Sequence, residues 1–144
     1  MPNHNRFSFA YIFIGFLGFL DASYLAIEHY RGLVPTCGFI QGCDVVTTSS
    51  FSVLYGVPLA YLGVVYYLTV LLLGVASFDF KDERLFWLLT ALSVIGFGAS
   101  LGFVYLQLFV LKAICIYCMG SAVTSTALFI TSLTWYWSQR VQNS

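Results

Sequence analysis

Four cysteines in two pairs are the residues of this chain whose type and spacing are best suited to chemistry. Cys37 and Cys43 are separated by five residues, whereas Cys115 and Cys118 form a C-x-x-C motif. A C-x-x-C motif at a helix N-terminus presents both sulfurs on one face, where the helix dipole favours the first thiolate. Lys112, three residues before Cys115, adds positive potential there. The two pairs together favour a dithiol–disulfide relay.

Three other interpretations of the cysteines remain open at this point. The first is a pair of structural disulfides, although a closed C-x-x-C ring restrains a very short loop and gains little chain entropy. The second is a four-cysteine zinc site, but such sites pair cysteines at closer spacing than the five residues of the first pair. The third is a set of buried, inert thiols. On balance we predict no metal site.

The composition places these cysteines in a membrane protein. Apolar residue types make up 60% of the 144 residues, charged types make up 8%, and the mean hydropathy is +0.87. A soluble domain carries about 25% charged residues, so six acidic and six basic side chains are too few to cover this surface in water. The formal net charge of zero also excludes a nucleic-acid-binding protein that relies on a basic face.

Charge clusters divide the chain into apolar runs of membrane-spanning length. Residues 7–27 and 57–77 are two such runs, close to the ~20 residues that cross a bilayer. Residues 85–137 carry Lys112 as their one charge and would form a helix of about 80 Å, so we divide them into two spans. The prediction is an all-α integral membrane protein with one domain over residues 1–144. Its four-transmembrane-helix bundle has helices at about 7–28, 57–77, 85–111 and 113–137, and a long outer loop over residues 29–56.

Small and aromatic residues predict where these helices meet one another and the lipid headgroups. The small-xxx-small pattern over residues 98–102 is expected at a helix–helix contact. Tyr66 and Tyr67 are expected at the headgroup level, where aromatic belts form.

Basic residues predict the orientation in the membrane. One side of the predicted bundle holds Arg6, Lys81, Arg84 and Arg140, and the other holds Arg31 and Lys112. Because cytoplasmic loops carry the excess of Lys and Arg, we predict cytoplasmic termini and cysteine pairs on the outer, periplasmic face of the cell inner membrane. Disulfides form and persist on that side. In an alternative, residues 7–20 belong to a signal peptide, and the other three spans keep their orientation.

At these motifs the chain resembles the vitamin K epoxide reductase family, in its bacterial or archaeal form without a fused thioredoxin domain. The matching segments are LDASYL at 20–25, C-x5-C-D-V-V at 37–46, S-x3-G-V-P-L-A at 52–60 and YLQLFVLKAICIYC at 105–118. The resemblance extends over about residues 10–135. A C-x5-C loop before an S-x3-G-V-P span, with C-x-x-C opening the last of four helices, is a specific combination.

The resemblance implies a role for each cysteine. Cys37 is then the outer shuttle cysteine that meets a secreted thioredoxin-like (DsbA-like) protein, and Cys43 passes electrons on by attacking Cys115. Cys118 is the sulfur released beside a membrane quinone, which it reduces. Each transfer between cysteines is thiolate attack through a mixed disulfide. The implied activity is a DsbB-like, quinone-linked thiol oxidase that supports disulfide formation, with ubiquinone, menaquinone or a related quinone as electron acceptor.

The quinone contacts that we expect are Leu59, Ala60, Ala122 and Asp21. Animal members of the family have an asparagine and a tyrosine where this chain has Leu59 and Ala122, so the resemblance favours a respiratory quinone. Asp21 is the one charge in residues 7–27, and acids inside spans are functional candidates. Two alternative functions are reduction of vitamin K quinone or its epoxide, and a non-enzymatic tetraspan scaffold with structural disulfides.

Overall fold

The computed structural model describes residues 4–33, 45, 50 and 53–144. Its four long helices are α1 (His4–Tyr30), α3 (Leu59–Phe80), α4 (Glu83–Tyr105) and α5 (Ile116–Asn143). Each is long and apolar enough to cross a membrane, the third together with the η2 turn (Leu106–Val110) that follows it. The prediction of an all-helical chain with four spans is therefore confirmed. Cys37, Cys43 and most of the predicted outer loop lie outside the described residues.

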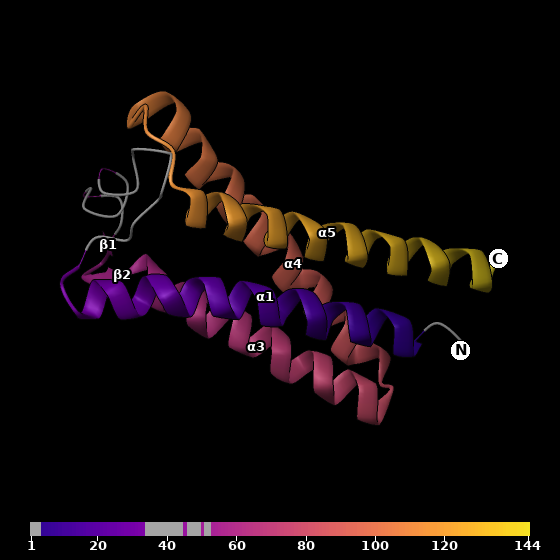
Figure 1. Ribbon diagram of the computed structural model, residues 1–144. Helices are drawn as coiled ribbons and strands as arrows, with labels where there is room; N and C mark the ends of the chain where they lie inside the picture. The colour runs from indigo at the N-terminus through magenta and orange to yellow at the C-terminus, as the bar shows by residue number, and fades with distance from the viewer. Residues whose placement is uncertain (1–3, 34–44, 46–49, 51–52) are drawn as a thin grey trace.

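The helices run up and down, so alternate connections fall at opposite ends of the bundle (Figure 1). Both chain termini lie at one end, together with the turn between α3 and α4. The start of α5 lies at the other end, with the end of α1 and the start of α3. α1 packs along α3 and also against α5, and α5 packs on α4. This topology places Cys115 at the end where the loop that contains the first cysteine pair leaves and re-enters the bundle.

A short hairpin leads into the second span. β1 (Val53–Leu54) pairs antiparallel with β2 (Val57–Pro58). The two residues between them, Tyr55 and Gly56, have φ of 52° and 83°. Positive φ at both central residues is the geometry of a type I′ turn, whose twist matches that of paired strands. α3 then begins directly after the hairpin, with Pro58 as its N-cap.

The helix bounds differ from the predicted ones mainly around the C-x-x-C motif. The third span ends in η2, a π-helical turn over Leu106–Val110, and residues 111–115 are not helical. Lys112 adopts a positive φ of 51°, which is uncommon for a residue other than glycine. α5 therefore begins at Ile116 rather than at residue 113, and it continues to Asn143. The motif thus lies across the start of the helix.

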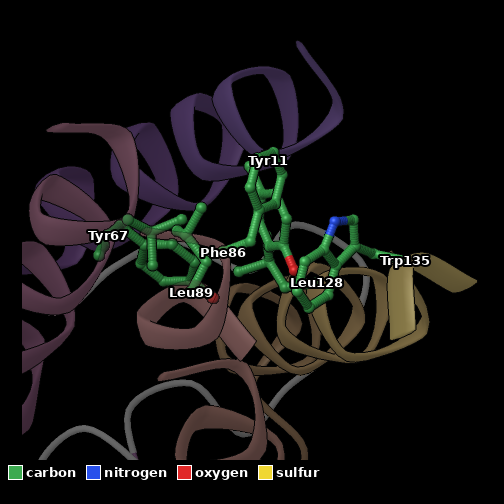
Figure 2. Close-up of a cluster of buried hydrophobic side chains, with 8 residues drawn as sticks. Tyr11, Tyr67, Phe86, Leu89, Leu128 and Trp135 are labelled. Atoms are coloured by element: carbon green, nitrogen blue, oxygen red, sulfur yellow. The ribbon is translucent and has the colours of Figure 1, made fainter. Parts of the chain in front are cut away.

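The core between the helices is largely aromatic (Figure 2). Its members are Tyr11, Ala22, Tyr67, Val70, Phe86, Leu89, Leu128 and Trp135. The rings of Phe86 and Trp135 stack, with centroids 5.2 Å apart and 11° between their planes. On the outer surface Phe9, Leu72 and Ile95 are 66%, 64% and 66% exposed. Large apolar side chains that point outward along every span are expected where lipid is the solvent.

Two packing expectations are wrong. A Cβ atom at Gly98 or Gly102 would meet no described atom within 4 Å, so the small-residue pattern makes no helix contact among the described residues. Tyr67 is 1% exposed rather than at the headgroups. Its ring occupies the space beside Gly18, where a Cβ atom would lie 2.1 Å from Cε1. Tyr66 also points inward and donates a hydrogen bond to the Leu92 carbonyl oxygen at 3.0 Å.

Candidate redox site

Cys115 is the N-cap residue of α5, with an extended backbone at φ −101° and ψ 121°. Its side chain is fully buried, whereas Cys118, in the first turn of the helix, is partly exposed. Both are free thiols, and their side chains interact by a hydrogen bond. The structure therefore brings the two sulfurs of the C-x-x-C motif together at a helix start, as the spacing predicts.

Gln107 in the η2 turn holds the backbone of Cys115. The Cys115 N–H donates to Gln107 Oε1 at 3.0 Å, and Gln107 is 2% exposed. The Ala113 N–H donates to the Gln107 carbonyl oxygen, also at 3.0 Å. π-Helical turns are rare and frequently occur at functional sites. Here the turn carries a buried amide that fixes the position of the first cysteine of the motif.

Neighbours on α5 make the Cys115 thiol more acidic. The hydrogen bond with Cys118 is the largest cause, and the net effect lowers the pKa of Cys115 from its ordinary 9.0 to about 7. The backbone amides of Cys118 and Tyr117 act in the same direction, as expected at the positive end of a helix. Burial and the charge of Asp21 oppose them. The Lys112 side chain is exposed, and the acidity comes from the helix and its second cysteine.

Asp21 approaches the same turns of α5 from α1. A Cβ atom at Gly120 would lie 3.7 Å from Asp21 Oδ1 and 4.0 Å from Oδ2. Oδ2 is buried, and no described group forms a hydrogen bond with it. The charge of Asp21 acts on both Cys115 and Cys118. The structure thus brings Asp21, a candidate from the sequence, beside the C-x-x-C motif.

Tyrosines from two other helices border this region of α5. The Tyr24 and Tyr117 rings are in contact, with centroids 4.8 Å apart. The Tyr67 hydroxyl donates to the Ser121 carbonyl oxygen at 3.0 Å and lies 2.7 Å from the Thr124 hydroxyl. The region beside the motif therefore combines aromatic surface with hydroxyl groups that can exchange hydrogen bonds.

The other residues predicted to contact a quinone are apolar and half-buried. Leu59 and Ala60 begin α3, and Ala122 lies one turn along α5 from Cys118. All three belong to the end of the bundle that carries the motif (Figure 1). Asp21 is the member of the predicted set that reaches α5 from another helix through a described contact.

The part of the chain that the structure describes has no group of three His, Cys, Asp or Glu side chains arranged to hold a metal ion. Two hollows on the surface are lined by the C-terminal part of α5, one of them together with Glu83 and Trp87 of α4. Both lie at the end of the bundle with the chain termini, away from Cys115 and Cys118.

The sequence of this chain matches that of a known family. A sequence model of the vitamin K epoxide reductase family matches residues 9–133, a range that includes all four cysteines. The chain belongs to the vitamin K epoxide reductase family. No curated protein matches the chain significantly. A vitamin K epoxide reductase family member with four spans is a multi-pass membrane oxidoreductase, and the family is linked to quinones and vitamin K.

The vitamin K epoxide reductase motifs alone did not single out two residues that the structure adds to the site. Gln107 is the one amide side chain in residues 85–137, and that isolation in an apolar stretch is a usable signal. Tyr67 has no comparable signal, because the neighbouring Tyr66 has the same side chain. The contact with Gly18 and the hydrogen bonds of its hydroxyl group to α5 distinguish its position.

Proposed function

We propose that this protein is a membrane dithiol oxidoreductase that passes electrons from a secreted thioredoxin-like protein to a membrane quinone. The observation that carries the proposal is the Cys115–Cys118 pair at the start of α5, where Cys115 has a pKa of about 7. A thiolate is the nucleophile in thiol–disulfide exchange, and the best attacking thiols have a pKa near the ambient pH. A structural disulfide in a scaffold has no need for such an acidic thiol.

The proposed electron path uses the four cysteines in order. Cys37 exchanges with the dithiol of the protein partner, and Cys43 then attacks Cys115, which forms a mixed disulfide. Cys118 is released from its bond with Cys115 as a thiol. Cys37 then attacks Cys43, which frees Cys115 as a thiol and re-forms the Cys37–Cys43 disulfide. Two electrons per cycle pass in this way from the partner to the pair Cys115 and Cys118. Because the Cys115 N–H is held by Gln107, the backbone of the cysteine that is attacked stays anchored while its disulfide partners change.

A quinone supplies a two-electron acceptor that stays in the bilayer. Leu59, Ala60 and Ala122 offer apolar surface to its ring, and Asp21 offers a polar group beside the motif. This set suits a quinone head, because ligand sites combine apolar lining with a few placed polar groups. We place the proposed reaction at the outer end of the bundle, with the protein in the cell inner membrane.

The proposal is tested with purified protein, dithiothreitol and a soluble ubiquinone or menaquinone analogue. Cys118→Ala is expected to reduce quinone reduction to background, because the sulfur that meets the quinone is removed. Cys37→Ala is expected to keep more than about half of the dithiothreitol-driven rate, since access decides which sulfur a reductant attacks and a small dithiol reaches Cys115–Cys118 directly. Cys37→Ala is also expected to abolish turnover with a thioredoxin-like protein.

Further outcomes test the ordered path and decide between this activity and its alternatives. Cys118→Ala is expected to accumulate the disulfide between Cys43 and Cys115, which non-reducing mass spectrometry detects. Equal loss of dithiothreitol-driven activity in both variants would refute the ordered path. Fixed disulfides with no quinone reduction in the unmodified protein would favour a scaffold, and reduction of vitamin K epoxide alone would favour that substrate.

A further inference from the structure

Asp21 is the one polar residue among the four proposed quinone contacts, and apolar packing does not explain a carboxyl at this position. The side chains of Leu59, Ala60 and Ala122 have no polar atoms. The Asp21 carboxyl projects from α1 toward Gly120 of α5, with Oδ2 buried and no described hydrogen-bond partner for it. A carboxylate enclosed in a span is costly unless it is paired, and such residues commonly mark proton relays.

The proposed reaction has a proton requirement that the cysteines alone do not meet. Oxidation of two thiols breaks two S–H bonds, forms one S–S bond and releases two electrons and two protons. The quinone takes up two electrons and two protons to become a hydroquinone. The first of these protons leaves Cys115 readily, because its thiol is already acidic and lies before the first turn of α5. The Cys118 thiol lies within the first turn of α5, so its proton needs a nearby group that can accept it.

Building on the proposed function, we propose that Asp21 is a proton-transfer residue of the site. Asp21 accepts the proton of Cys118 as the disulfide with Cys115 forms, and it donates this proton to a quinone oxygen. The second quinone oxygen takes its proton from water at the outer end of the bundle, which balances the one that Cys115 released. Asp21 returns to its starting state in each cycle. The Asp21 carboxyl reaches this part of α5, 3.7 Å from the Cβ position of Gly120, and its charge acts on the Cys118 thiol.

The titratable groups around this carboxyl come from each helix that packs against α1. From α5 they are Cys115, Tyr117 and Cys118, each of which interacts electrostatically with Asp21. From α3, Tyr67 reaches Ser121, next to Gly120, through its hydroxyl group. On α1 itself, Tyr24 lies against Tyr117. The cysteines titrate or change redox state during the reaction, so the proton affinity of Asp21 is linked to theirs.

The test compares the full-length protein with its Asp21→Asn, Asp21→Glu and Glu28→Gln variants. Quinone reduction by dithiothreitol is measured with a soluble ubiquinone analogue from about pH 5 to 9. Asp21→Asn is expected to lower the rate at saturating quinone about 100-fold, the usual scale for a lost acid–base group, and to flatten the pH profile. Asp21→Glu keeps a carboxyl and is expected to retain at least about a tenth of the rate of the unmodified protein. Glu28→Gln is the matched control on α1.

Alkylation of Cys115 provides a second readout that needs no quinone. The charge of Asp21 raises the pKa of Cys115. In the Asp21→Asn variant, Cys115 is therefore expected to be alkylated at least as fast as in the unmodified protein near neutral pH. Because unfolding would expose the buried Cys115 and speed its alkylation, the thermal unfolding midpoint is measured beside it. Slower quinone reduction with an unchanged unfolding midpoint and undiminished alkylation separates proton transfer from a loss of fold.

The possible results distinguish this inference from the proposed function. If the unmodified protein does not reduce the quinone, the proposed function fails first. If it does, and Asp21→Asn matches it in rate and pH profile, Asp21 is not the proton-transfer residue and the proposed function stands. Asp21→Glu no more active than Asp21→Asn would also overturn the inference, since a carboxyl would then be insufficient. A larger loss in Glu28→Gln than in Asp21→Asn would likewise overturn it.

Discussion

Cys115 is the residue whose protonation state controls the chemistry that we propose for the site. Its thiol has a pKa of about 7 because the Cys118 side chain hydrogen-bonds to it. Since only the thiolate attacks a disulfide or an alkylating agent, its reactivity rises as pH passes upward through that pKa and levels off above it. Because its pKa is lowered, Cys115 forms the thiolate at a lower pH. Its reactivity therefore rises at a lower pH than that of an ordinary cysteine.

The contribution of Cys118 to this acidity is testable in a protein that lacks the first pair, Cys37→Ser with Cys43→Ser. Iodoacetamide alkylation of Cys115, followed by mass spectrometry, is expected to have its pH midpoint near 7. Cys118→Ala removes the donor and is expected to raise the midpoint by about one unit or more. Cys118→Ser retains an O–H donor and is expected to stay closer to the starting value. An unchanged midpoint in Cys118→Ala would contradict this explanation.

Among the elements, the η2 turn positions the motif through one buried side chain. Gln107→Leu removes the acceptor of the Cys115 N–H and is expected to destabilise the protein by about 1–3 kcal/mol, the cost of a buried donor without a partner. Gln107→Glu keeps an oxygen at that position and is expected to lose less. Thermal unfolding in detergent micelles measures the difference, and Gln142→Leu at the exposed end of α5 is the control. Equal unfolding midpoints for Gln107→Leu and Gln142→Leu would contradict a positioning role.

Helix contacts are tested by two glycines with opposite surroundings. A Cβ atom at Gly18 would lie 2.1 Å from the Tyr67 ring, which is held in place by its hydroxyl bond to Ser121. Gly18→Ala is therefore expected to cost about 1–3 kcal/mol, as overpacked cores do. Gly98→Ala meets no described atom within 4 Å and is expected to be neutral or slightly stabilising. The same loss of stability in both variants would show that Gly98 also lies at a contact, such as one between two copies of the chain.

These elements also show what a sequence can and cannot predict. The four spans followed from length and hydropathy, because the bilayer sets both. The C-x-x-C pair followed from spacing alone, since a helix turn brings positions three residues apart together. A small-residue pattern such as 98–102 permits close approach but does not say which helix approaches. The delayed start of α5 depends on Gln107 and on the positive φ of Lys112, which are tertiary features.

For the molecule as a whole, the fold gathers the described chemistry at one end of the bundle and both termini at the other (Figure 1). An even number of spans brings both termini to the same end of the bundle, so the four spans predicted from the sequence already implied this arrangement. The described residues form four such helices. Arg6, Lys81, Arg84 and Arg140 accordingly lie at or near the end with the termini, and Arg31 and Lys112 at the end with the motif. This unequal distribution of Lys and Arg is the basis for predicting which end faces the cytoplasm.

Orientation is tested with a membrane-impermeant maleimide applied to intact and to permeabilised cells after reduction. Because Lys and Arg concentrate in cytoplasmic segments, Cys37 is expected to be labelled in intact cells. Ser144→Cys, in a protein without the native cysteines, places a thiol on an exposed residue at the opposite end and is expected to be labelled after permeabilisation only. Reversal of both results would place the Cys115–Cys118 pair in the reducing cytoplasm, where stable disulfides are rare. The proposed supply of oxidising equivalents to secreted proteins would then fail, even if the purified protein reduced quinones.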